Sequence, residues 1–100
     1  MRRFRVPEGS VERFAASVRE VLAGRPIGRI VSVEPEAGRL VVRFRKLGTT
    51  ELVYETRPEN GGFIAELASE RVAPFHAPFR AEFEQKLEQI LAELGATLEA

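Results

Sequence analysis

The sequence contains no cysteine, no aspartate and a single histidine, His76. The lack of cysteine excludes disulfides and thiolate chemistry, and one histidine is too few for the usual structural zinc sites. The phosphate-binding patterns G-x-G-x-x-G and G-x-x-x-x-G-K-[ST] are also absent. A catalytic triad would have to use His76, and no serine or threonine lies in a nucleophile-elbow context. We therefore expect no cofactor and no metal, and an enzyme using His76 is the least favoured functional hypothesis.

Long apolar runs are missing as well. The first residues, "MRRFRVPEGSVERF", contain no apolar core of signal-peptide length, and no segment approaches the roughly 20 apolar residues of a membrane-spanning helix. We therefore expect a soluble, cytoplasmic protein with no membrane partner. Its 100 residues, of which 44% are hydrophobic and 30% charged, fit a single α+β domain over 1–100.

Charge is balanced overall but unevenly distributed. Residues 1–50 carry eleven bases and five acids, which gives +6, whereas residues 51–100 carry four bases and ten acids, which gives −6. This pattern favours two halves that neutralise each other across a sheet; a basic surface for an anionic partner is the alternative. All fifteen acids are glutamate and thirteen of the fifteen bases are arginine, a composition that hints at a thermophile.

Two amphipathic helices are predicted, one near each end of the chain. The first follows Ser10, a suitable N-cap, and ends before Gly24. The second has Pro78 in its first turn and ends near Gly95. Its apolar stripe, spaced by three and four residues, comprises Phe79, Phe83, Leu87, Ile90, Leu91 and Leu94.

The middle of the chain is predicted to form an antiparallel meander. A four-residue loop over 35–38 would place Val33 opposite Leu40. A three-residue loop over 47–49 would place Phe44 opposite Leu52 and Arg45 opposite Glu51. Turn residues at 60–62 begin a further strand that fades near Val72.

The predicted fold class is α+β, with an antiparallel meander sheet of three to five strands packed against an N-terminal and a C-terminal helix. The order is β-α-β-β-β-β-α if residues 2–6 form a short edge strand, or α-β-β-β-α if they form a basic arm. We expect both helices on one face of the sheet. That face carries Val31, Val33, Leu40, Val42, Phe44, Leu52, Tyr54, Phe63 and Leu67.

The segment "APFHAPFRAEF", residues 73–83, contains the histidine between two prolines. We interpret it as a corner between strand and helix, with Phe75 anchored on the core and His76 in a packing or capping role. Arg80 lies one turn further along, and Tyr54 faces inward with a hydroxyl that needs a partner. The alternative hypothesis is that Tyr54, His76 and Arg80 bind a small apolar or anionic ligand between the sheet and the C-terminal helix.

The outward face of the sheet is predicted to mix apolar and charged side chains. It would carry Ile30, Val41, Val53 and Ile64 among Arg43, Arg45, Glu51, Glu55 and Glu66. Such a face suggests cover by a partner. We therefore favour a non-enzymatic binding protein of unknown biological role that forms a homodimer through Ile30, Val41, Arg43, Arg45, Glu51, Val53 and Ile64. Nucleic acid is disfavoured because the arginines face acids and no aromatic residue lies among them.

Overall fold

The computed structural model describes residues 1–99. A six-stranded antiparallel sheet is covered by two α-helices, and two short 3₁₀-helices, η1 and η2, lie in the connections. In chain order the elements are β1 (Arg3–Val6), α1 (Val11–Ala23), η1 (Pro26–Arg29), β2 (Val31–Glu36), β3 (Arg39–Arg45), β4 (Thr49–Glu59), β5 (Gly62–Arg71), η2 (Pro74–Phe79), α2 (Arg80–Glu93) and β6 (Thr97–Glu99).

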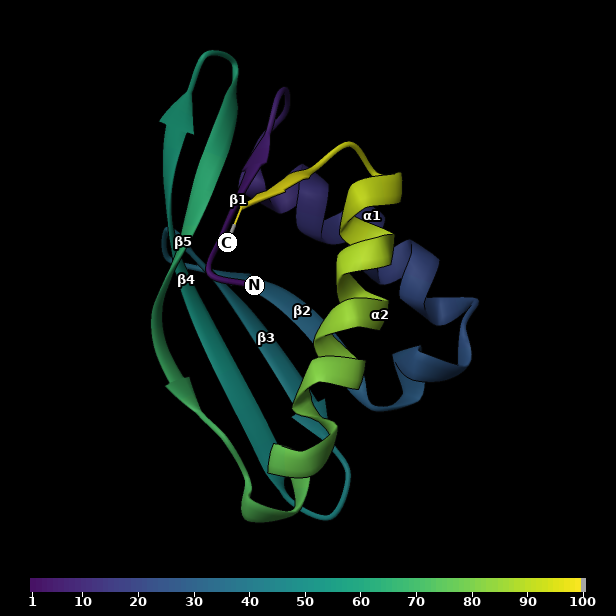
Figure 1. The fold of residues 1–100 in the computed structure, drawn as a ribbon. Helices are drawn as coiled ribbons and strands as arrows, with labels where there is room; N and C mark the ends of the chain where they lie inside the picture. The colour runs from purple at the N-terminus through teal and green to yellow at the C-terminus, as the bar shows by residue number, and fades with distance from the viewer. Residues whose placement is uncertain (100) are drawn as a thin grey trace.

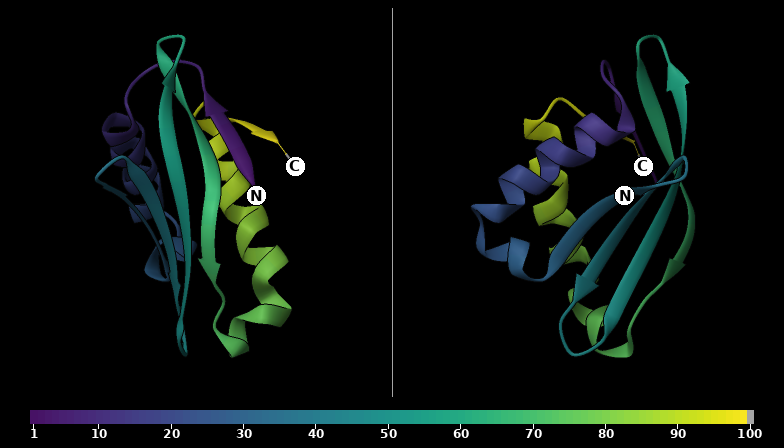
Figure 2. Two further views of the ribbon diagram at one scale, coloured as in Figure 1. Left: turned by 90° about the vertical axis from the view of Figure 1, so that its left-hand side faces the viewer. Right: turned by 180° about the vertical axis from the view of Figure 1, so that it is seen from behind.

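The predicted α+β class with an antiparallel sheet is confirmed, and the sheet has one strand more than expected. The strand order is β2-β3-β4-β5-β1-β6. β1 is therefore neither an edge strand nor an arm, because β5 pairs on one side of it and β6 on the other. Both α-helices lie on the same side of the sheet, and within residues 1–99 no helix covers the other side (Figures 1 and 2).

Each helix begins where local chemistry allows it. Ser10 caps α1 by accepting a hydrogen bond from the Arg13 amide at 3.1 Å, and Gly24 follows its last turn. The second helix starts later than predicted. Pro78 lies inside the 3₁₀-helix η2, and α2 begins at Arg80.

Two hairpins differ from the predicted register by two residues. β2 and β3 are joined by a two-residue turn, Ala37–Gly38, whose φ angles are 45° and 79°, so that Val33 pairs with Val42. β3 and β4 are joined by residues 46–48, so that Phe44 pairs with Thr50. Side chains alternate along a strand, and a shift of two therefore leaves each residue on its predicted face.

The core lies between the sheet and the two helices. It contains all the predicted inward-facing residues except Leu67, which is half-buried at its margin. Side chains of the two helices pack on these sheet residues and complete the core. Its helical members are Phe14, Ala15, Val18, Leu22, Leu87, Ile90 and Leu91. Phe83 packs against this core and stacks on Phe44, with ring centroids 5.4 Å apart.

Candidate functional site

His76 is buried between η2, β4 and the β3–β4 loop, with 3% of its surface exposed. Its Nδ1 lies 2.7 Å from Thr50 Oγ1, and its Nε2 bonds the carbonyl oxygen of Lys46. A carbonyl only accepts, so Nε2 carries the proton, and in the neutral ring Nδ1 accepts from the Thr50 hydroxyl. That hydroxyl in turn accepts from the Ala73 amide at 3.0 Å.

This arrangement resembles a hydroxyl–histidine pair, but it lacks access to a substrate. Thr50 is 3% exposed, like His76. The space beside them, lined by Phe44, Leu52 and Phe83 among others, measures about 10 Å³. That volume holds at most about one water molecule. Because a substrate cannot reach His76 and Thr50, we interpret their hydrogen bond as a structural link between η2 and strand β4.

The other two predicted ligand-binding residues are also engaged within the protein. The Tyr54 hydroxyl donates to the carbonyl oxygen of Met1 at 2.7 Å, and burial raises the pKa of Tyr54. Arg80 lies beside the same small cavity as His76, but its guanidinium pairs with both carboxylate oxygens of Glu70. This hydrogen-bonded pairing lowers the pKa of Glu70. The ligand hypothesis requires a cavity shared by these three side chains. The cavity beside His76 and Arg80 measures only about 10 Å³, and Tyr54 does not line it.

The outer face of the sheet is closed by ion pairs around Val41. Only 4% of Val41 is exposed, although its side chain lies on the face opposite to that of its core neighbours Leu40 and Val42. Arg43 reaches Glu51 at 2.9 Å and Glu36 at 3.3 Å. The hydrogen bond to Glu51 raises the pKa of Arg43. The long side chains of such pairs cover apolar surface while their charges stay in water.

A second network covers Ile64, which is 1% exposed and lies between Arg5 and Arg57 in the register. Arg57 pairs with Glu66 at 2.8 Å, and Arg5 pairs with Glu59 and Glu99. Two of the apolar residues predicted to be open on this face, Val41 and Ile64, are thus covered within the protein itself. The two networks also join the basic first half of the chain to the acidic second half.

The remaining predicted interface residues are dispersed. Ile30 was predicted to lie on the outer face, but it precedes β2 and packs against the core. Val53 is half-buried on that face, opposite Val41. Arg45 pairs in register with Thr49, because Glu51 lies opposite Arg43 instead. Glu55, opposite Arg39, is exposed.

η2 and the β3–β4 loop meet at the opposite end of the sheet from the β4–β5 hairpin (Figure 1). Large apolar side chains of these two segments are exposed. Leu47 is 79% exposed, Phe75 71% and Phe79 54%. We call these three residues the apolar end. The predictions that Phe75 is anchored on the core and that Phe79 belongs to the core stripe are wrong, because neither residue is part of the core cluster. Phe79 lies at its margin, with its ring centroid 6.5 Å from that of Phe83.

The apolar end is held by fixed contacts. His76 bonds the carbonyl oxygen of Lys46, next to Leu47 in the chain, and so ties η2 to the β3–β4 loop. A Cβ on Gly48 would lie 3.2 Å from that of Ala73, so the two segments also touch. Leu47 adopts a φ of 55°, a left-handed conformation that is costly for a branched, bulky residue.

Unpaired basic residues flank the apolar end. Arg45 ends β3, Lys46 precedes Leu47, and Arg71 ends β5. All three are exposed, and none takes part in the ion pairs found among residues 1–99. The nearby acids Glu51 and Glu70 are already bound to Arg43 and Arg80. The apolar end is therefore locally cationic in a protein of zero net charge.

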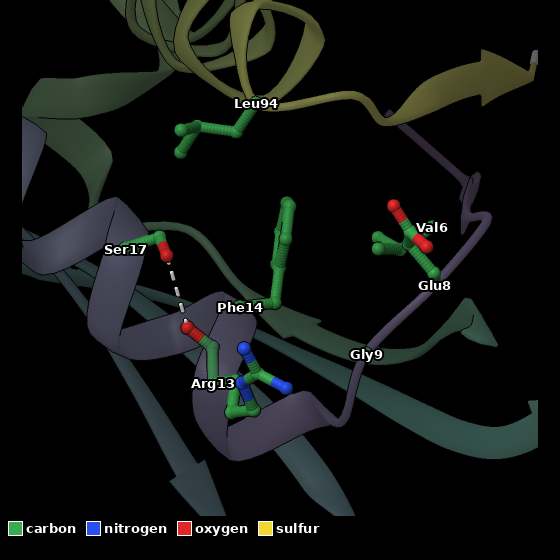
Figure 3. Close-up of a pocket in the computed structure, with 7 residues that line it drawn as sticks. All are labelled: Val6, Glu8, Gly9, Arg13, Phe14, Ser17 and Leu94. Atoms are coloured by element: carbon green, nitrogen blue, oxygen red, sulfur yellow. Dashed lines mark hydrogen bonds between the residues drawn. The ribbon is translucent and has the colours of Figure 1, made fainter. Parts of the chain in front are cut away.

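A hollow of about 420 Å³ lies between α1 and the end of α2 (Figure 3). Phe14 and Leu94 point into it, and Arg13 and Glu8 lie at its margin. Its volume suits a small ligand. Its charged groups, however, are exposed and of opposite sign, and Ser17 Oγ is bonded to the Arg13 carbonyl oxygen at 3.2 Å. Nothing in this hollow selects a particular ligand.

No family model, curated protein or solved structure matches this chain. Within residues 1–99, no cluster of three or more histidine or acidic side chains is placed to hold a metal ion. In the same residues no helix combines the length and the apolar character needed to cross a membrane. Ser32 Oγ is buried without a hydrogen-bond partner. The apolar end is the place in the described residues where large apolar side chains are exposed.

Proposed function

We propose that this protein is a non-enzymatic binding protein that docks on a partner through the apolar end. The observation that carries the proposal is the exposure of Leu47, Phe75 and Phe79 at one end of the molecule. Exposed apolar groups gathered in one place are typical of interaction sites.

The backbone supports the same proposal. A left-handed Leu47 is unfavourable, and glycine or asparagine would suit that position better. A largely exposed leucine adds little to the core. The hairpin turn requires the positive φ, as the turns at Ala37 and Asn60 also do, but it does not require a leucine. A bulky apolar residue kept at such an exposed position supports a role in binding.

Site-specific photo-crosslinking in the producing cells tests this proposal. A photoreactive phenylalanine analogue replaces Phe75, and the control places it at Ala16, an exposed residue of α1. We expect Phe75 to give a crosslinked product that Ala16 does not give. Equal products at both positions, or none at Phe75, would contradict docking through the apolar end.

Self-association through the outer face stays a prediction, now with less support because Val41 and Ile64 are buried within one copy. Sedimentation at micromolar concentration measures it. A dimer that Val53→Glu weakens without unfolding the monomer would support that face as the interface, and a monomer at high concentration would rule it out. The cytoplasmic location likewise remains a prediction.

A further inference from the structure

We infer that the partner of the apolar end is the surface of an anionic lipid bilayer, into whose interface Leu47, Phe75 and Phe79 insert. This inference rests on the proposed function and names the partner. The expectation of no membrane partner followed from the lack of a membrane-spanning segment, but docking on a surface needs no such segment.

The first argument is charge complementarity. Arg45, Lys46 and Arg71 flank the apolar end and take part in no ion pair among residues 1–99, whereas the neighbouring acids Glu51, Glu70 and Glu82 are paired with Arg43, Arg80 and Lys86. Basic residues beside an inserted apolar group are attracted to the negative surface of phosphatidylserine-rich membranes. Apolar insertion and basic attraction are the two signals that together give stable attachment.

The second argument is area. An aromatic side chain buries about 150–250 Å² when fully covered. Leu47, Phe75 and Phe79, exposed at 79%, 71% and 54%, therefore offer a small apolar area that protrudes from the protein. A bilayer needs no larger area, because lipid surrounds each side chain separately.

The third argument is shape. The three side chains stand on two adjoining turns, and none of them lines the small cavity of about 10 Å³ beside His76. A protein partner would need a matching pocket, since this end offers none for a side chain to enter. Bilayer lipids adapt to protruding side chains. His76 holds both turns in place, so docking needs no rearrangement of the loops.

Vesicle co-sedimentation tests the inference. The probes are vesicles of phosphatidylcholine alone and of phosphatidylcholine mixed with phosphatidylserine. We expect the mixed vesicles to bind the protein more tightly, and higher salt to weaken that binding as charges are screened. The triple variant Leu47→Asn, Phe75→Gln, Phe79→Gln should lower the partition coefficient at least tenfold, given the hydrophobic contribution of three side chains.

A matched pair of double variants tests the charge argument. Lys46→Gln with Arg71→Gln should weaken binding to mixed vesicles about 25-fold, at about fivefold per basic residue. Arg19→Gln with Arg39→Gln changes the net charge equally at exposed positions away from the apolar end, where neither arginine forms an ion pair among residues 1–99. We expect this variant to leave binding unchanged. Equal loss in both variants would overturn the inference, because binding would then follow net charge alone.

Fluorescence reports the insertion directly, because the chain contains no tryptophan. Phe75→Trp should shift its emission to the blue on mixed vesicles, and Ala16→Trp should not. Unchanged thermal melts would show that each variant is folded. Failure of the wild type to bind mixed vesicles, or undiminished binding by the triple variant, would overturn the inference. If the protein does not bind vesicles but Phe75 crosslinks to a protein, docking through the apolar end stands and the lipid partner is ruled out. If Phe75 crosslinks to nothing, both the docking function and the lipid partner are ruled out.

Discussion

The outer face of the sheet and the apolar end both combine apolar and basic side chains, but these apolar side chains are buried on the outer face and exposed at the apolar end. On the outer face, Val41 and Ile64 lie among arginines that are paired with glutamates, and both are buried without a helix above them. At the apolar end, Leu47 and Phe75 lie near basic residues that are unpaired, and both are exposed.

The difference comes from the backbone that presents the side chains. Antiparallel strands place Arg43 directly opposite Glu51, with side chains on one face close enough to pair across strands. The stems of such pairs extend over the apolar residue between them. A loop and a 3₁₀-helix offer no cross-strand neighbours, so their side chains extend into water. Apolar composition alone therefore does not identify a docking surface.

The largest expected effect is on the outer face. Ile64→Ala should lower the free energy of unfolding by about 2–5 kcal/mol, as for other buried aliphatic truncations. Phe75→Gln should change it by less than about 0.5 kcal/mol, because the side chain is 71% exposed. Urea denaturation measures both. Similar losses for the two variants would abolish the contrast between the regions.

His76→Ala should cost about 2–3 kcal/mol, because the Lys46 carbonyl and the Thr50 hydroxyl each lose a buried partner. Amide hydrogen exchange should rise chiefly in the β3–β4 loop and in η2, which the ring joins. Ala77→Gly, an exposed neighbour in η2, serves as the control. Uniform loss of protection over the whole sheet would show that His76 does not act locally.

The ion pairs on the outer face should give a smaller, pH-dependent effect. The hydrogen bond from Arg3 holds the pKa of Glu66 below its ordinary value of 4.5. A lowered pKa stabilises the fold at pH values above 4.5, and this contribution is lost as the pH falls through the folded-state pKa. Solvent screening keeps it small. The melting temperature of wild type should therefore exceed that of Glu66→Gln near neutrality and approach it in acid; a constant difference would contradict this assignment.

The smallest effect is expected at Leu47. Glycine adopts the left-handed conformation without strain, which stabilises the folded state, but it also gives the unfolded chain more conformational freedom. The free energy of unfolding of Leu47→Gly should therefore stay within about 0.5 kcal/mol of wild type. Ala37→Gly is the matched control, because Ala37 also has a positive φ, of 45°. Both variants should melt alike, and only Leu47→Gly should weaken docking. A marked loss of stability at Leu47 alone would mean that the leucine serves folding.

Part of the site could have been predicted from the sequence. Periodicity correctly placed Phe83 against the core, but it also extended the helical stripe to Phe79. Pro74 and Pro78 lie in the 3₁₀-helix η2, which interrupts the α-helical period before α2 begins. These two prolines were the sequence signal that could have excluded Phe79 from the helical stripe. The pairing of His76 with Thr50 had no local signal, because the two residues meet only when the sheet and the corner fold together.

The sequence by itself determined the α+β class, the first helix and the inward or outward face of the long strands, because these follow from local periods of 3.6 and 2 residues. Tertiary structure decided the two-residue register shifts, the central position of β1 beside β6, and the burial of Val41 and Ile64. It also decided the exposure of Phe75 and Phe79. These features depend on contacts between segments distant in the chain, and such contacts leave no period in the sequence.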